Sequence, residues 1–479
     1  MGAVLGPLVV MAIDWCTTSR GTTRYYLYAL VTAIVGIFTW SRVELQEFPR
    51  NSWHLVGSGL LVIGIVQQLV GNFRLWPTAF FFGILLVSSL ASLSHFPSLH
   101  SVFTLGEWIL VCQACALLTS EWIILCVLPG QPSFELSQMV AVTGVIGCSV
   151  SCAMASNGRS KSISLPFRLA ILVALPLLFV EASLYVVHWS PRNPIFAFPL
   201  SLQWLAHFLL ATESTGGASF LHTTMGMSAI TWPRYYWILY WVVVLLITLP
   251  LSPVTSSSSS RTALVVARKW FHGIAILLFV PVTAAAPKLQ SLAYAIALAA
   301  LCALECVRDE FPALNTFYCR YLDSSKDVVV GGDSVLPKDK QPQPIIISHM
   351  TLIAGCAVPL WITETIPNNF DPSYRLLVSL WGVVSLGVGD TMGALVGTKF
   401  GHIRWGARRT VEGSLAMLTS VTFASYLILG SEAFIQNLWP VALTAIFVTL
   451  LEAFTTQIDN LVLPLAGAVV LLLTIEQGL

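Results

Sequence analysis

Long apolar runs, separated by short polar segments, recur along almost the whole chain and constrain its fold more than any other feature. The chain has 479 residues, of which 56% are hydrophobic and only 10% are charged. A soluble domain normally carries about 25% charged residues. An α-helix needs about 20 apolar residues to cross the hydrocarbon region of a bilayer. We therefore expect an all-α, polytopic transmembrane bundle with roughly 13–17 spans.

The candidate spans form two groups, one on each side of a serine-rich segment. The first group lies near residues 25–40, 53–71, 76–93, 102–119, 136–155, 166–187, 194–212 and 232–251. The second group lies near residues 270–286, 289–305, 344–366, 376–397, 413–431, 436–451 and 460–475. The segment between them begins SPVTSSSSSRT, which has the composition of a flexible linker. The chain is accordingly divided into an N-terminal multi-span region (1–251), a linker with a basic pre-helix segment (252–269) and a C-terminal membrane domain (270–479).

Neither the charge nor the cysteine content indicates a nucleic-acid-binding or zinc-thiolate protein. The net charge is +1, and no basic patch is interleaved with aromatic residues. Cys112 and Cys115 have the spacing of a redox or zinc pair, but no second pair or histidine partner follows at ligand spacing. We interpret the cysteines as small apolar residues packed within the bilayer.

Residues 387–413 combine an acid, several glycines and clustered cations. Asp390 lies between glycines near the end of an apolar run, and Lys399, Arg408 and Arg409 follow it. A carboxylate can hold a divalent cation, and Lys and Arg side chains neutralise phosphate oxygens. An acid near the apolar region costs about 2.5–3.5 kcal/mol on insertion scales and usually marks function. The stretch therefore indicates phosphoryl or nucleotidyl chemistry at a membrane surface.

The same stretch also has a purely structural interpretation. Gly389, Gly393, Gly397 and Gly401 recur at every fourth position. This spacing lets transmembrane helices approach one another closely. The cations would then be ordinary charges on the cytosolic side of a span. The spacing alone supports both interpretations equally.

Counting spans brings distant polar segments to one face of the membrane. If each span of the second group crosses once, the segment before 270 and the loops 306–343, 398–412 and 452–459 all emerge on the same side. Clustered cations in these segments place that side in the cytosol. Glu305 and Arg308, three residues apart on a helix face, have the spacing of a structural ion pair.

Four motifs in this half resemble those of the polyprenol kinase family: ARKWFH (267–272), GVGDTMGALVGTKFG (387–401), RRTVEGSLA (408–416) and EAFTTQIDNLVLP (452–464). The second and third motifs together are more specific than either alone. The multi-span N-terminal half is similar to that of the dolichol kinases within this family. A related pattern occurs in CDP-diacylglycerol synthases, which are the alternative interpretation. A transporter is a further alternative, although we find no repeat across the linker.

The resemblance implies a CTP-dependent kinase of the endoplasmic reticulum membrane, with catalytic loops that face the cytosol. It would phosphorylate the terminal hydroxyl of dolichol and give dolichyl phosphate for protein glycosylation. CTP would be the phosphoryl donor, and Mg²⁺ or another divalent cation the cofactor. The signatures of soluble kinases are missing from the sequence, so the glycines and cations would have to bind the phosphates.

On this interpretation the candidate residues have three roles. The catalytic group contains Asp390, Arg409, Glu412 and Asp459. The CTP-binding group contains Gly387, Gly389, Gly393, Lys399, Arg408, Thr410, Arg268, Lys269, His272 and Asn460. The metal ligands would be Asp390 together with Asp459 or Glu452. Glu412 would orient Arg409 or contribute to the metal site, and Asp390 or Asp459 would accept the hydroxyl proton.

Overall fold

The computed structural model describes residues 136–157, 164–188, 200–212, 232–251, 261–318, 346–365, 371–405, 409–454 and 459–474. Nearly all regular structure in these ranges is helical. The exception is a short antiparallel ribbon of β1 (Arg404–Trp405) and β2 (Arg409–Thr410). The predicted all-α class is therefore confirmed.

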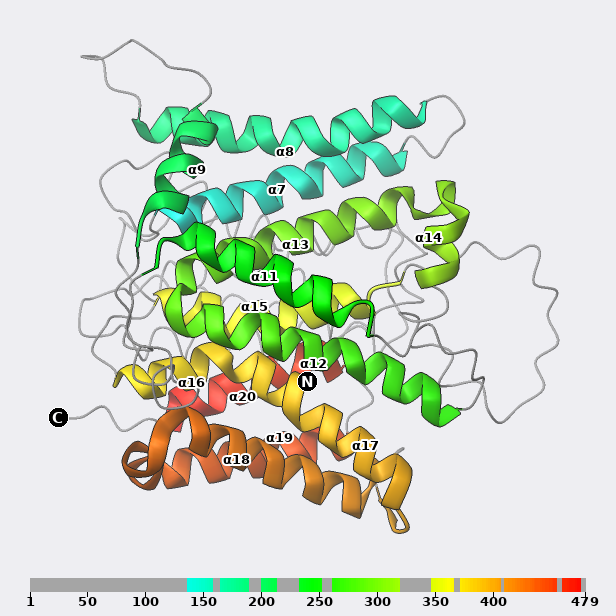
Figure 1. The fold of residues 1–479 in the computed structure, drawn as a ribbon, viewed down its shortest axis with the longest axis vertical. Helices are drawn as coiled ribbons and strands as arrows, with labels where there is room; N and C mark the ends of the chain where they lie inside the picture. Colours follow the sequence, from blue (N-terminus) through cyan, green and yellow to red (C-terminus); the bar gives the residue numbers. More distant parts are fainter. Residues whose placement is uncertain are drawn as a thin grey trace, which may run out of the picture.

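The helices lie side by side, as rows across the view in Figure 1. In chain order they are α7 (Leu136–Asn157), α8 (Leu165–His188), α9 (Leu200–Leu210), α11 (Arg234–Thr248), α12 (Arg261–Ala285), α13 (Pro287–Val307), η4 (Arg308–Glu310), α14 (Pro312–Phe317), α15 (Ser348–Thr365), α16 (Pro372–Gly382), η7 (Val383–Asp390), α17 (Thr391–Phe400), α18 (Val411–Gln436), α19 (Leu438–Phe454) and α20 (Asp459–Thr474). Each predicted span from 136–155 onward coincides with one or more of these helices. The four earlier ones, from 25–40 to 102–119, lie outside the described residues.

Among the described residues, 4 helical segments are long and apolar enough to cross a membrane. These are Leu165–Leu184, Pro287–Val307, Pro372–Phe400 and Val411–Gln436, and shorter apolar helices accompany them. Large apolar side chains also cover the outside of the bundle, such as Leu246 (69% exposed) and Trp439 (71% exposed). An apolar exterior suits a lipid environment. The polytopic membrane class is confirmed, whereas the total number of spans stays a prediction.

Aromatic side chains of α11 hold α12 where its helical hydrogen bonding is interrupted. Pro281 has no N–H, so the carbonyl of Leu277 lacks its usual intrahelical donor. Tyr240 donates its hydroxyl hydrogen to that carbonyl at 2.6 Å. The indole of Trp241 donates to the next carbonyl, that of Leu278, at 2.9 Å. These bonds fix the position of α12, the helix that carries Lys269 and His272.

Helix α12 begins earlier than the sequence suggested. Its first residue is Arg261, so residues 261–269 are helical and do not form a pre-helix segment as we expected. The serine run before it and the basic residues Arg261, Arg268 and Lys269 made this part look like a linker, although residues 263–267 are apolar and continue the helix.

Residues 372–400 form one helical path through the middle of the C-terminal half. Asp371 caps its start, because its carboxylate accepts hydrogen bonds from the N–H groups of Ser373 and Tyr374. The path then takes π-helical form over η7 and returns to α-helix at Thr391. Asp390 is therefore the last residue of a π-helical segment. Such segments occur often at functional sites.

Candidate active site

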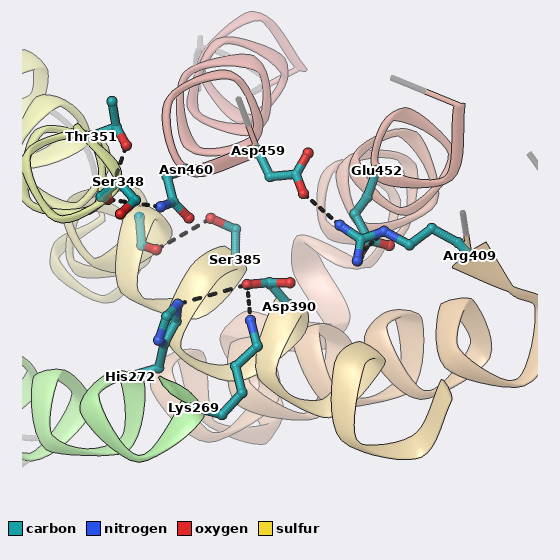
Figure 2. Close-up of polar contacts among 11 residues, drawn as sticks. Lys269, His272, Ser348, Thr351, Ser385, Asp390, Arg409, Glu452, Asp459 and Asn460 are labelled. Atoms are coloured by element: carbon teal, nitrogen blue, oxygen red, sulfur yellow. Dashed lines mark hydrogen bonds and ion pairs between the residues drawn. The ribbon is translucent and has the colours of Figure 1, made fainter. Parts of the chain in front are cut away.

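Asp390 contacts two side chains of α12. Lys269 donates a hydrogen bond to its carboxylate, and His272 Nε2 lies 3.7 Å from the same oxygen. Lys269 and His272 are separated by one turn of α12, so both reach across to the end of η7 (Figure 2). The side chain of Asp390 is only 8% exposed, so its charge depends on these partners for compensation.

Arg409 bridges two further carboxylates. Its Nε lies 3.1 Å from Glu452 and its terminal nitrogen 2.5 Å from Asp459. Glu452 is the most buried of the three, with 2% of its side chain exposed. Burial acts to lower the pKa of Arg409, but the carboxylates of Glu452, Asp459 and Asp390 outweigh it and raise that pKa above its ordinary value. Arg409 thus stays charged.

The two groups of charges form one polar cluster within an apolar bundle. Figure 2 shows Lys269, His272 and Asp390 on one side and Arg409, Glu452 and Asp459 on the other. The two sides are close together at Gly393. This residue lies three positions after Asp390, and a Cβ atom there would be 3.9 Å from Glu452 Oε1. We call these six residues, Lys269, His272, Asp390, Arg409, Glu452 and Asp459, the charge cluster. They come from α12, η7, β2, α19 and α20.

Asn460 joins the start of α20 to the start of α15. Its side-chain amide donates to the carbonyl of Ser348 at 3.0 Å, as Figure 2 shows. A Cβ atom on Gly355 would collide with the Asn460 carbonyl, so only glycine allows the two helices to lie this close. Asn460, a predicted CTP-binding residue, therefore positions its neighbour Asp459.

Thr410 and Glu412 close the loop between α17 and α18. Thr410 is the N-cap of α18, because its hydroxyl accepts a hydrogen bond from the N–H of Gly413 at 3.2 Å. Glu412 accepts from the N–H groups of His402 and Ile403 at 3.0 and 3.2 Å. The described contacts of Glu412 thus lie with the loop backbone, and not with Arg409 as its expected role required.

The glycines of the central helix are packed against protein. A Cβ atom on Gly387 would lie 2.8 Å from Ile276, and one on Gly389 would lie 2.7 Å from Val421. On Gly393 it would lie 3.4 Å from the carbonyl oxygen of Gly413. These glycines therefore allow close helix packing, as the structural interpretation of their spacing predicts. The contacts give no support to their expected role of letting phosphate approach the backbone.

The remaining predicted cations lie outside the charge cluster or outside the described side chains. Lys399 is exposed at the end of α17, with its ammonium 5.1 Å from the centre of the Phe400 ring. Arg408 and the side chain of Arg268 lie outside the described part of the chain.

A second polar group, near the start of α15, has a structural arrangement. Glu305 accepts from Arg308 at 3.0 Å and from the N–H of Ile346 at 3.1 Å. Arg308 also donates to Asn315. The sequence predicted the Glu305–Arg308 pair. It did not predict that Glu305 would also bind the backbone at the beginning of the next span, because a contact to the N–H of Ile346 does not depend on the type of side chain there.

Within the described residues, no group of three acidic, histidine or cysteine side chains is arranged to hold a metal ion. Each carboxylate of the charge cluster contacts a cation instead. Mg²⁺, however, usually takes only one or two carboxylates and completes its coordination with water and substrate phosphates. The donor chemistry of Asp390, Glu452 and Asp459 therefore fits a metal that binds together with a nucleotide.

Comparison with known proteins gives one consistent group of relatives. No protein-family model matches the chain, and no solved structure matches it. The chain is 32% identical over 235 residues to the dolichol kinase EVAN of Arabidopsis thaliana, which covers 47% of this chain and 38% of the relative. It is 30% identical over 292 residues to the dolichol kinases of Mus musculus and Homo sapiens. These matches cover 58% and 57% of this chain, and 48% and 46% of the relatives.

The chain thus spans less than half the length of each of these relatives, and over the matched part it is similar to dolichol kinases, as its motifs predict.

Proposed function

We propose that this chain catalyses the CTP-dependent phosphorylation of the terminal hydroxyl of dolichol, giving dolichyl phosphate for protein glycosylation. Its relatives carry the name dolichol kinase. The observation that supports a site for this chemistry is the charge cluster, in which segments distant in sequence bring buried carboxylates and cations together. Residues 270–479, with the loop 387–413, would be the catalytic domain.

Phosphoryl transfer depends mainly on positioning and on neutralising charge, because its transition state is loose. Arg409 and Lys269 are the cations of the charge cluster that would contact phosphate oxygens. To do so they would exchange their present carboxylate partners for the nucleotide. Arg408, Lys399 and Arg268 would add positive charge around them.

In the reaction the hydroxyl oxygen of dolichol bonds to the γ-phosphorus, the bond to the β–γ bridging oxygen breaks, and CDP leaves. The hydroxyl proton passes to a carboxylate, for which Asp390 and Asp459 are the candidates. Asp390, with Asp459 or Glu452, would hold Mg²⁺, which when bound neutralises charge on the phosphates. Thr410, Glu412 and Asn460 would act by keeping the loop and α20 in place.

The location of the site is part of the same proposal. The four residues come from the first half of α12 (Lys269), the end of η7 (Asp390), the loop after α17 (Arg409) and the start of α20 (Asp459). With the cations on the cytosolic side, this end of the bundle would face the cytosol at the endoplasmic reticulum membrane, where CTP is available.

Labelled nucleotide tests the proposal directly. The purified full chain in detergent micelles is incubated with Mg²⁺, dolichol and CTP labelled at the γ-phosphate, with Asp390→Asn as the control. We expect label on the lipid from the unaltered protein only. A parallel reaction contains CTP labelled at the α-phosphate and phosphatidic acid. Transfer of that label to phosphatidic acid would identify a cytidylyltransferase instead. Absence of transfer in both reactions would favour the transporter.

A further inference from the structure

One face of α12 contacts the central helix beside the charge cluster. Lys269 and His272 contact Asp390, and Ile276 fills the space beside Gly387. These three side chains are spaced three and four residues apart, which places them on one side of the helix. Gly273 lies at the edge of the same face, one turn after Lys269.

Gly273 has room for a Cβ atom among the described residues, in contrast to the glycines opposite it. A Cβ atom at Gly273 would meet no atom of the described residues within 4 Å. Gly430 is the other described glycine with this property, and it has a positive φ of 75° that itself favours glycine. Glycine within a helix is less favourable than alanine. At Gly273 the described contacts give no packing reason that offsets this cost.

Exposed apolar surface of the described residues lies one turn from Gly273, where Tyr240 of α11 contacts the carbonyl of Leu277. Gly273 itself is half-buried, and Leu277, one turn further along α12, is 48% exposed. Leu277 belongs to the apolar exterior that suits lipid. A molecule that approaches from the membrane along this surface would therefore pass from Leu277 to Gly273 and then to Lys269 and Asp390.

We propose that the gap at Gly273 admits the hydroxyl end of an isoprenoid alcohol sideways from the membrane to the Lys269–Asp390 pair. This inference rests on the proposed function and adds the acceptor subsite to it. An isoprenoid alcohol is an apolar chain that ends in one small hydroxyl, so it can follow an apolar surface and needs little room at its polar end. A nucleotide triphosphate is too highly charged to take this route.

Filling the gap tests the inference. Gly273→Leu and Gly273→Ala are compared with Ala300→Leu, which adds similar bulk at an exposed position of α13. With the full chain in micelles, we expect Gly273→Leu to raise the KM for dolichol at least tenfold and to leave the KM for CTP within twofold. Gly273→Ala should give a smaller rise without lowering the melting temperature, and Ala300→Leu should behave like the unaltered protein.

A KM for dolichol within twofold of the unaltered value in Gly273→Leu would overturn the inference, and so would an equal rise in the KM for CTP. Binding of tritiated dolichol to the chain in nanodiscs separates this inference from the proposed function. If the unaltered protein binds dolichol without phosphorylating it, the proposed function fails, and weaker binding by Gly273→Leu still supports the subsite. Unchanged binding by Gly273→Leu or Gly273→Ala would refute it.

Discussion

Replacing Arg409 by alanine should destabilise the protein and abolish its activity for separable reasons. Arg409 compensates Glu452 at 3.1 Å and Asp459 at 2.5 Å. Removing one partner of a buried ion pair costs about 3–5 kcal/mol, because the other charge is left buried and unpaired. Arg409 is 31% exposed and Asp459 29% exposed, so solvent reduces the cost on that side. We therefore expect Arg409→Ala to lower the free energy of unfolding by about 3 kcal/mol.

A second substitution shows where this loss originates. Glu452→Gln removes the buried negative charge and keeps the shape of the side chain. The double variant Arg409→Ala/Glu452→Gln keeps only the partly exposed carboxylate of Asp459 without its guanidinium partner. It should therefore recover about 2 kcal/mol of the loss. Its phosphorylation activity should stay absent, because no guanidinium remains to contact phosphate. Unfolding in mixed dodecylmaltoside and SDS micelles gives the free energies, and transfer from γ-labelled CTP gives the activity.

The interaction free energy between the two substitutions decides the outcome. A value near zero would mean that Arg409 does not compensate Glu452, and the described charge cluster would be incorrect. Recovery of activity in the double variant would mean that Arg409 acts only by compensating Glu452, and its proposed contact with phosphate would be refuted.

Three further substitutions test other parts of the structure. Asp390→Asn should lower turnover by about 10²–10³-fold with normal membrane insertion, and near-normal turnover would exclude Asp390 from metal binding. Lys399→Ala should mainly raise the KM for CTP, by no more than about fivefold because an exposed charge contributes only about 0.2–1 kcal/mol; an unchanged KM would remove it from the site. Gly467→Ala would drive a methyl group into the indole of Trp381, so we expect a loss of about 1–3 kcal/mol in unfolding experiments, and unaltered stability would contradict this packing.

The apolar runs predicted the helices well because a bilayer leaves few alternatives to a helix for a span. The ends of helices were harder to predict. Helix α12 extends back to Arg261, since the length of a helix outside the apolar region is not set by hydropathy. The π-helical form of η7 was also missed, because the insertion of an extra residue into a helical turn has no simple residue pattern.

The candidate site was predictable as a set of residues but not as a set of pairs. Span counting placed Lys269, Arg409 and Asp459 on one face, and the structure brings these three residues together with Asp390. Which cation meets which carboxylate depends on how each helix is rotated about its axis, and no pattern within one segment fixes that. The role of the glycines could not be predicted either. Their spacing alone could not distinguish close packing against α18 from close approach of a phosphate group.

The charge balance of the cluster bears on how a nucleotide could bind. Lys269 and Arg409 supply two positive charges, and Asp390, Glu452 and Asp459 supply three negative charges when ionised. The net charge of these five groups is then negative, so they alone would repel a triphosphate. A divalent cation held by the carboxylates would reverse the sign, and both basic side chains would then be able to contact phosphate. On the proposed function we therefore expect metal and nucleotide to bind together, with Lys269 and Arg409 compensating the carboxylates before they bind.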